Sequence, residues 1–168
     1  MSLARLNALP ASEAAPVLHA ICGSNRWTSA MAAKRPFATQ EAVLAEADRA
    51  WFALDKADWL EAFSHHPQIG ERNLNQAKFA SAATQSSQEQ SGMAAASDAE
   101  REAFARGNAE YERKFGHVFL ICATGKSAPE MLGALRARLN NTPEIELKNA
   151  AAEQAKIIRL RLEKWLNT

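Results

Sequence analysis

The sequence predicts an all-α fold, and three observations point to it. Alanine, which loses the least free energy on entering a helix, makes up 36 of the 168 residues, whereas glycine occurs only seven times. Capping signals recur along the chain, and apolar residues between them follow helical spacing. The length falls within the usual size of one domain. We therefore expect a single domain over residues 1–168, a bundle of several helices with a short buried extended segment near residues 118–122.

The first part of the chain carries two helix signals. Ser12 can cap a helix that stops at Gly23, because a serine oxygen accepts a hydrogen bond from a free N–H of the first turn. Thr39 can cap a longer helix in the same way. The core-facing residues of that longer helix are expected to be Leu44, Ala47, Trp51 and Leu54.

A short helix is expected next. Asp58 is predicted to open it, and a proline determines where it ends. Pro67 makes an α conformation unfavourable for the residue before it, His66. The helix should therefore end near His65.

Two Ser-x-x-Glu patterns then predict helix N-termini by the capping-box rule, in which serine and glutamate side chains each bond the other's backbone N–H. Ser97 with Glu100 starts a helix that runs up to Gly116, a residue suited to a left-handed C-terminal conformation. Ser127 with Glu130 starts the second. Its apolar positions are Leu132, Leu135 and Leu139.

The last predicted helix is long and packed along one face. Thr142 followed by Pro143 is a start signal, because proline is tolerated in the first helical turn. Residues at helical spacing keep one face apolar over the following turns. They are Leu147, Ala151, Gln154, Ile158, Leu162 and Trp165.

Between two of these helices lies the apolar run Val118-Phe119-Leu120-Ile121-Cys122. It contains β-branched and aromatic residues and stands between Gly116 and Gly125. Periodicity alone assigns such a short run neither to a strand nor to a buried helix. We treat it as a buried extended segment.

Charge and composition exclude several classes of partner. Twenty Lys and Arg against 19 Asp and Glu leave a net charge of +1. Proteins that bind nucleic acid need an excess of positive charge to contact the phosphate backbone, so we expect no nucleic-acid partner. The chain never approaches about 18 consecutive apolar residues, and its N-terminus has no apolar leader pattern. We expect a cytoplasmic protein with no membrane segment, a small-molecule ligand, and two buried thiols, Cys22 and Cys122.

Two motifs that suggest other chemistry are set aside. Gly125-Lys126-Ser127 looks like the end of a phosphate loop, but Leu120 stands where that loop needs a glycine. His65, His66 and Glu71 suggest a metal, yet adjacent histidines on a helix cannot face one ion, and no HExxH spacing exists. We expect no metal site.

The segment Ser64-His65-His66-Pro67-Gln68-Ile69-Gly70-Glu71-Arg72 is of a different kind. A histidine stands at a helix end, is followed by proline and precedes a glycine turn, which is how a loop presents an imidazole to a pocket. The alternative is a surface loop with incidental histidines, and composition alone favours that alternative. Matches elsewhere in the chain decide between the two.

Those matches, in order along the chain, are Trp27, Arg35-Pro36-Phe37, Asp58-Trp59-Leu60-Glu61-Ala62-Phe63, His66-Pro67-Gln68-Ile69-Gly70, Ser86-Ser87-Gln88-Glu89-Gln90, Tyr111-Glu112-Arg113-Lys114-Phe115-Gly116, Phe119-Leu120-Ile121-Cys122, Gly125-Lys126-Ser127 and Arg138-Leu139-Asn140. With this set the sequence resembles the family of 2-oxo-4-hydroxy-4-carboxy-5-ureidoimidazoline (OHCU) decarboxylases over nearly its whole length. Each piece alone is weak, but their order and spacing are specific. His65 is a departure, because relatives often have a residue without a titratable side chain there.

The resemblance implies an all-helical enzyme of the ureide pathway that needs no cofactor and converts OHCU to (S)-allantoin. Three residues are implied to act on substrate: His66, Glu89 and Arg138. Three more are implied to line the pocket: Pro67, Ser86 and the backbone around Ile121. A homodimer is plausible by the same resemblance.

Two other functions stay open at this point. A helical binding or scaffold domain without activity would show the same caps and core, and a lyase or hydrolase acting on another cyclic ureide would share much of the site. Without the resemblance, Glu89 would be interpreted as a solvated helix residue and Arg138 as a surface arginine. Substrate turnover separates these possibilities.

Overall fold

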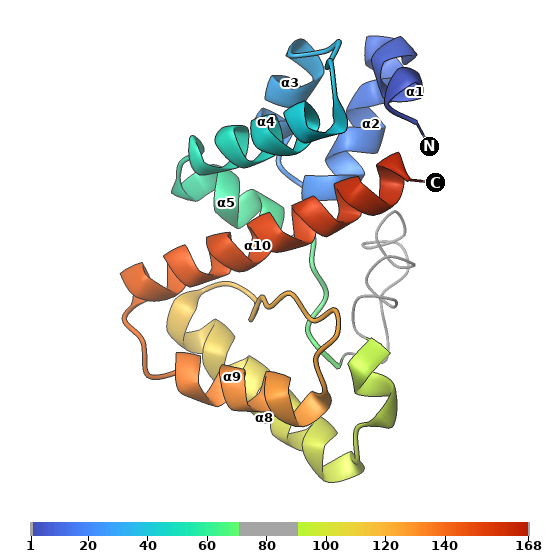
Figure 1. Ribbon diagram of the computed structural model, residues 1–168. Helices are drawn as coiled ribbons and strands as arrows, with labels where there is room; N and C mark the ends of the chain where they lie inside the picture. The colour runs from blue at the N-terminus through green and yellow to red at the C-terminus, as the bar shows by residue number, and fades with distance from the viewer. Residues whose placement is uncertain (1, 71–90, 168) are drawn as a thin grey trace. The chain divides into compact units, whose positions relative to one another are not determined.

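The computed structural model describes residues 2–70 and 91–167 (Figure 1). Within these ranges the chain forms eight α-helices and one short 3-10 helix, with no strand among them, so the predicted all-α fold is confirmed. None of these helices combines the length and the apolar composition that a membrane span requires. The elements are α1 Leu3–Ala8, α2 Ala11–Cys22, α3 Asn25–Ala33, α4 Gln40–Phe52, α5 Lys56–Phe63, η1 Ser91–Ala95, α8 Asp98–Phe115, α9 Ala128–Arg138 and α10 Pro143–Leu166.

The chain divides into two compact units. Unit 1 comprises Met1–Ala62 and Gln154–Thr168, and unit 2 comprises Phe63–Glu153. Helix α10 therefore contributes its first part to unit 2 and its second part to unit 1. The expectation of one domain over residues 1–168 stays a prediction.

Unit 1 is built around buried tryptophans. Helix α3 packs against both α2 and α4, and the side chains of Trp27 on α3 and Trp51 on α4 are completely buried. The Trp27 indole N–H donates to the carbonyl of Ala47 at 3.0 Å. The Trp59 indole N–H donates to the carbonyl of Trp51 at 3.1 Å. The indole N–H groups of Trp27 and Trp59 thus each have a partner, as burial of such a ring requires.

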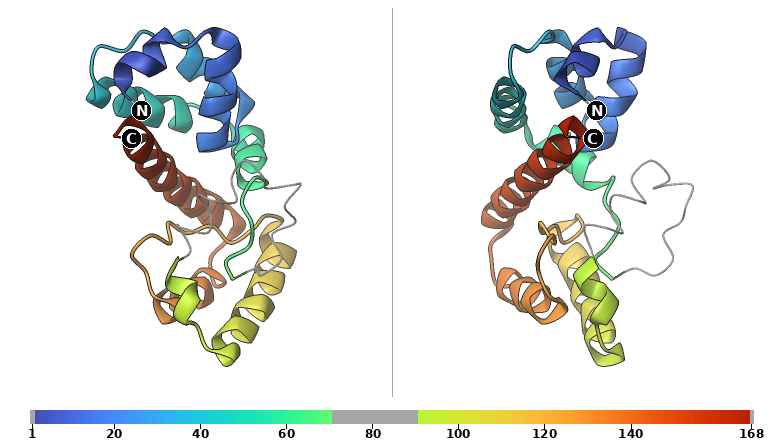
Figure 2. Two further views of the ribbon diagram at one scale, coloured as in Figure 1. Left: turned by 90° about the vertical axis from the view of Figure 1, so that its right-hand side faces the viewer. Right: turned by 45° about the vertical axis from the view of Figure 1, so that its right-hand side comes forward.

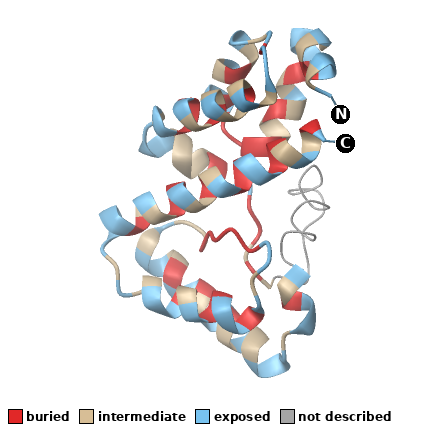
Figure 3. Cartoon of the chain, viewed as in Figure 1, coloured by how far each residue is buried: buried red, intermediate tan, exposed pale blue. Residues whose placement is uncertain are grey.

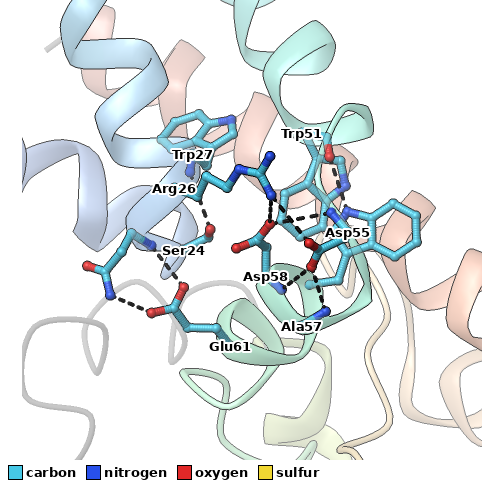
Figure 4. Close-up of polar contacts among 10 residues, drawn as sticks. Ser24, Arg26, Trp27, Trp51, Asp55, Ala57, Asp58 and Glu61 are labelled. Carbon is cyan, nitrogen blue, oxygen red and sulfur yellow. Dashed lines mark hydrogen bonds and ion pairs between the residues drawn. The ribbon is translucent and has the colours of Figure 1, made fainter.

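The start of α3 is tied to α5 by polar side chains, as Figure 4 shows. The Arg26 guanidinium lies 3.0 Å from Asp58 and 3.3 Å from Asp55. The backbone N–H of Asn25 donates to Glu61 at 3.0 Å. Exposed ion pairs contribute little stability, about 0–1 kcal/mol each. Their effect here is to fix the place of α5, the helix that leads to His66.

The Arg35-Pro36-Phe37 motif, which precedes α4, is hydrogen-bonded to residues in and just after α1. Arg35 donates from Nη1 to the carbonyls of Leu6, at 2.8 Å, and Leu9, at 2.7 Å. Asn7 exchanges two hydrogen bonds with the backbone of Phe37, at 2.8 and 2.9 Å. This motif therefore has a structural role at the end of α1.

Unit 2 contains η1, α8, α9 and the first part of α10, and α8 and α9 lie side by side (Figures 1 and 2). Their close approach depends on Gly107, because a Cβ atom there would come within 2.6 Å of Leu135. Residues 118–123 carry no helix or strand, and Phe119–Ala123 are buried (Figure 3). The buried segment was predicted, and its burial is confirmed.

Most predicted helix ends are confirmed. The Thr39 side chain caps α4 by accepting the N–H of Ala42. Both capping boxes form, at Ser97 for α8 and at Ser127 for α9. Helices α2 and α8 end at Gly23 and Gly116, each in the left-handed conformation. Helix α10 begins at Pro143, and both cysteines are buried free thiols.

Two predicted helix starts are each wrong by two residues. Helix α2 begins at Ala11, so Ser12 lies inside it and caps nothing; the residue before the helix is Pro10, which has no side-chain donor or acceptor. Helix α5 begins at Lys56 instead of Asp58. The Asp55 carboxylate accepts the N–H groups of residues 57 and 58 and satisfies the first turn.

Candidate functional site

His66 lies just beyond the end of α5, and its side chain is buried. Helix α5 ends at Phe63, two residues before the predicted end, and the His66 N–H donates to the Phe63 carbonyl at 3.1 Å. His66 is 7% exposed, whereas its neighbour His65 is exposed. Pro67 is buried as well. Of the two neighbouring histidines, therefore, His66 is the buried one.

The loop after His66 is fastened to α8 at successive residues. The Gln68 side chain donates to Glu112 at 2.7 Å, and the Asn108 side chain donates to the Ile69 carbonyl at 3.0 Å. Gly70 follows with a φ of +83°, in the region that disfavours residues with a side chain. These three features hold the loop that follows His66 against α8.

Arg138 belongs to a polar cluster inside unit 2, which we call the Arg138–Glu146 cluster. Its Nε donates to Glu146 at 2.6 Å, and its Nη1 donates to the Leu120 carbonyl at 2.6 Å. Its Nη2 lies 2.5 Å from Glu146 and 3.5 Å from the Tyr111 hydroxyl. The guanidinium also covers the ring of Phe119, 4.7 Å from its centre. Each nitrogen of the guanidinium thus has a partner in the protein.

Burial and hydrogen bonding set the charges in this cluster. Burial opposes ionisation of Glu146, but hydrogen bonds from Arg138, Tyr111 and Asn141 outweigh it and hold the pKa of that carboxyl below its usual range. Burial raises the pKa of the Tyr111 hydroxyl, and its hydrogen bond to Glu146 raises that pKa further. Tyr111 is therefore a neutral donor, and Arg138 and Glu146 form an internal ion pair.

The side chain of Ile121 is part of the hydrophobic core of unit 2, which also contains Phe104, Phe119 and Leu135. Any contact of this residue with a ligand would therefore have to be made by its backbone groups. The expectation that the backbone around Ile121 lines a pocket stays a prediction.

The structure brings four of the six predicted site residues into unit 2: His66, Pro67, Ile121 and Arg138. The other two, Ser86 and Glu89, lie outside the described residues.

Three polar residues that contact Arg138 or the backbone of Cys122 were not predicted as site residues: Tyr111, Glu146 and Glu153. Glu146 carried one usable signal, since it precedes Ala150 and Gln154 at intervals of four on the buried face of α10. A carboxylate in that position requires a buried partner. Arg161 was not selected either; it is 6% exposed in unit 1 and donates to the Ile21 carbonyl at 3.0 Å.

Fold and site together define a class of protein: an all-α chain with one buried imidazole just past a helix end and a buried, non-helical backbone segment in the same unit. The sequence profile of the family described as OHCU decarboxylase matches residues 7–163. The chain belongs to the OHCU decarboxylase family. The predicted resemblance is thereby confirmed.

Two relatives are similar over large parts of this chain. The "Uric acid degradation bifunctional protein TTL" of Arabidopsis thaliana is 40% identical over 144 residues, which are 85% of this chain and 44% of that protein. The "2-oxo-4-hydroxy-4-carboxy-5-ureidoimidazoline decarboxylase" of Amia calva is 34% identical over 98 residues, 58% of this chain and 55% of that protein. The chain thus spans about half the length of these relatives.

A solved structure is similar over almost its full length. It is described as an OHCU decarboxylase crystallised in the presence of (S)-allantoin. It superposes with a TM-score of 0.77 at 35% identity, covering 90% of this chain and 98% of that one. The fold described above is therefore shared with that protein.

Proposed function

We propose that this chain removes CO2 from OHCU without a cofactor and releases (S)-allantoin, in the breakdown of urate. The observation that carries the proposal is the burial of His66 in a loop fastened to α8, within the His-Pro-x-Ile-Gly segment. Membership of the OHCU decarboxylase family supports it, as do the names of the relatives, which refer to uric acid degradation.

The substrate contains its own electron sink. Its carboxylate stands on a ring carbon that also bears a hydroxyl group, next to a carbon–nitrogen double bond. When the bond to the carboxylate breaks, its electron pair forms a double bond between the two ring carbons, and the electrons of the C=N bond move onto nitrogen. Nitrogen takes up a proton, which leaves CO2 and an enol form of allantoin. A metal, pyridoxal or thiamine sink is therefore unnecessary.

His66 is proposed to perform the general acid–base step. It takes the hydroxyl proton as the enol becomes a carbonyl, while the adjacent ring carbon receives a proton on one face, which sets the (S) configuration. Imidazole titrates near neutral pH, and a positioned base of this kind contributes roughly 10²–10⁴-fold to a rate. A buried ring beside a constrained loop is suited to this, because a group positioned before binding loses little freedom in the reaction.

The other proposed residues bind. Glu89 accepts hydrogen bonds from ureido or ring N–H groups, and Ser86 and Pro67 line the pocket. Arg138 donates to an anionic or carbonyl oxygen of the substrate. Because Glu146 already neutralises its charge, Arg138 offers directed hydrogen bonds more than a net positive charge.

The test is turnover in a coupled system, in which urate is oxidised in situ to generate the unstable substrate. Protein that has been dialysed exhaustively against a chelator should accelerate decay of the intermediate and give optically active (S)-allantoin. Racemic product at the uncatalysed rate would refute the proposal. Turnover that returns only with a divalent ion would refute its cofactor-independent part.

The two alternatives give different results in the same assay. A helical binding domain would bind a ureide without turning it over, and an enzyme acting on another cyclic ureide would leave the intermediate unchanged and consume a different substrate. A homodimer is also proposed on the family resemblance, and light scattering of the purified protein measures it.

A further inference from the structure

The buried segment Phe119–Ala123 is held by two charged side chains of opposite sign. Because this segment is neither helix nor strand, its backbone N–H and C=O groups have no regular hydrogen-bond pattern and must find other partners. Arg138 donates from Nη1 to the Leu120 carbonyl at 2.6 Å. Glu153, on α10, accepts the Cys122 N–H at 2.7 Å. Both contacts lie within unit 2, and they stand on either side of Ile121.

These contacts hold the two peptide groups that flank Ile121. The Leu120 carbonyl belongs to the peptide between residues 120 and 121, and the Cys122 N–H belongs to the peptide between 121 and 122. The cis peptide among the described residues is at Arg35–Pro36, so both groups here are trans. In a trans peptide the C=O and N–H point in opposite directions. The N–H of Ile121 therefore points away from Arg138, the partner of the Leu120 carbonyl, and the C=O of Ile121 points away from Glu153, the partner of the Cys122 N–H.

Ile121 consequently offers one donor and one acceptor. Neither group makes a hydrogen bond within residues 2–70 and 91–167, although Ile121 is only 6% exposed. Its side chain is anchored in the core of unit 2, so the residue cannot turn to satisfy them. A buried donor and acceptor of this kind require a partner, and a cyclic ureide carries N–H and C=O groups on neighbouring ring atoms.

We propose that Glu153 is a positioning residue for substrate: together with Arg138 it clamps the peptides beside Ile121, so that the N–H and C=O of this residue form a rigid recognition edge for the ring. This inference rests on the proposed function. Groups held in place before binding lose little freedom when the ligand arrives, so the clamp increases affinity for the ring. The Glu153 carboxylate does not touch substrate.

A positioning role is distinguishable from a purely structural one by kinetics. Glu153→Ala should raise KM about tenfold or more while kcat changes much less, because the lost interaction is made equally in the ground state and the transition state. The Kd for (S)-allantoin, measured by calorimetry, should rise in parallel. Glu153→Gln keeps an oxygen that accepts the Cys122 N–H and should stay within about threefold of wild type.

Glu163→Ala is the matched control on the same helix, because Glu163 pairs with Arg159 far along α10 and should leave KM unchanged. If Glu153→Ala fails to fold, Glu153→Asp replaces it; the shortened side chain keeps the charge but loses the reach, so KM should still rise. A folded Ala or Asp variant with the KM of wild type would overturn the positioning role.

The contact itself has a test that does not depend on activity. The chain contains two cysteines, so protein labelled with ¹⁵N-cysteine gives two cysteine amide signals, from Cys22 and Cys122. Glu153→Ala should move the Cys122 signal and leave that of Cys22 in place, and an unmoved Cys122 signal would overturn the clamp. Wild-type protein that neither turns over OHCU nor binds allantoin would refute the proposed function and the positioning role together. Active wild type with an indifferent Glu153→Ala variant refutes the positioning role alone.

Discussion

At the residue scale, the two adjacent histidines are the same kind of residue one position apart, yet only His66 is buried. Pro67 and the helix end at Phe63 turn the backbone so that His66 is enclosed and His65 is exposed. The hydrogen bonds of Gln68 and Asn108 then hold the loop after His66 against α8.

Exchange of each histidine for asparagine tests this difference. His66→Asn should lower kcat by roughly 10²–10⁴-fold, because it removes a positioned acid–base group. His65→Asn, the matched control, should stay close to wild type since that ring is exposed. Initial rates in the coupled urate assay measure both. Equal losses in two folded variants would remove the acid–base role from His66, and a larger loss at His65 would move it there.

Arg138 and Arg136 form a second pair, two positions and about 200° apart on α9. Arg138→Ala should lower kcat/KM roughly ten- to more than a hundredfold. It should also destabilise the fold by about 3–5 kcal/mol, because it leaves Glu146 buried without its cation. Arg138→Lys should remain impaired, since an ammonium cannot reproduce the planar fork. Arg136→Ala, at an exposed position, should change little.

Rates and urea unfolding are measured on all three variants, with helicity checked by circular dichroism. Folded Arg138 variants with near-normal kcat/KM would show that this arginine has a structural role alone. In that case Arg161, the buried arginine of unit 1, becomes the residue to exchange next.

At the element scale, local signals predicted most helix ends and long-range contacts determined the rest. Thr39, Ser97 and Ser127 act on N–H groups within three residues, so the sequence shows both partners at once. Helix α1 was not predicted because its start has no side-chain cap and its end is held by Arg35, 26 residues away from Leu9. Helix α3 was missed as well, although Ser24 caps it.

The same distinction applies to the site. His66 and Pro67 were selected through the family resemblance, whose His-Pro-x-Ile-Gly motif is continuous in the sequence, and their role in the site stays a prediction. Glu153 was not selected, because its contact with Cys122 joins residues 31 positions apart, and no spacing rule connects them. The contact between Glu146 and Tyr111 joins residues 35 positions apart and could not be predicted from the sequence for the same reason.

The capping box of α9 gives a prediction for a single helix. Ser127→Ala should lower the free energy of unfolding by about 1 kcal/mol, because it removes the acceptor for the Glu130 N–H. Ser12→Ala is the matched control: Ser12 is exposed inside α2, where alanine is the better helix former, so stability should stay equal or rise slightly. Urea unfolding measures both. Equal destabilisation by the two exchanges would contradict the assignment of the caps.

The Arg138–Glu146 cluster joins α8, α9 and α10 and makes stability depend on pH. The pKa of Glu146 is lower in the folded than in the unfolded protein, so its contribution is complete above the unfolded pKa of about 4.5 and is lost as pH falls through the folded value. Glu146→Gln should therefore destabilise the protein at pH 7, and the difference from wild type should shrink below about pH 4. Urea unfolding of both proteins at the two pH values checks the sign. A difference that grows towards low pH would be inconsistent with an ionised Glu146.

At the scale of the whole molecule, the question is whether units 1 and 2 behave as one domain. The family profile matches residues 7–163 and so includes parts of both units. Helix α10 belongs to both, with its residues up to Glu153 in unit 2 and those from Gln154 in unit 1. A helix forms cooperatively, so unfolding of the part of α10 in one unit should destabilise the part in the other unit. We therefore expect the two units to unfold together.

The distribution of aromatic residues allows a direct test of one domain. All four tryptophans, Trp27, Trp51, Trp59 and Trp165, belong to unit 1, so their fluorescence reports on that unit alone. Leu135→Ala, in the core of unit 2, should cost about 2–5 kcal/mol. If residues 1–168 form one cooperative domain, this exchange lowers the denaturation midpoint seen by tryptophan fluorescence as much as that seen by circular dichroism. Met31→Ala, in the core of unit 1, is the matched control and should likewise shift both midpoints together. A tryptophan midpoint that stays at the wild-type value in Leu135→Ala, while the helical signal shifts, would mean that unit 1 unfolds on its own and that the chain is two domains.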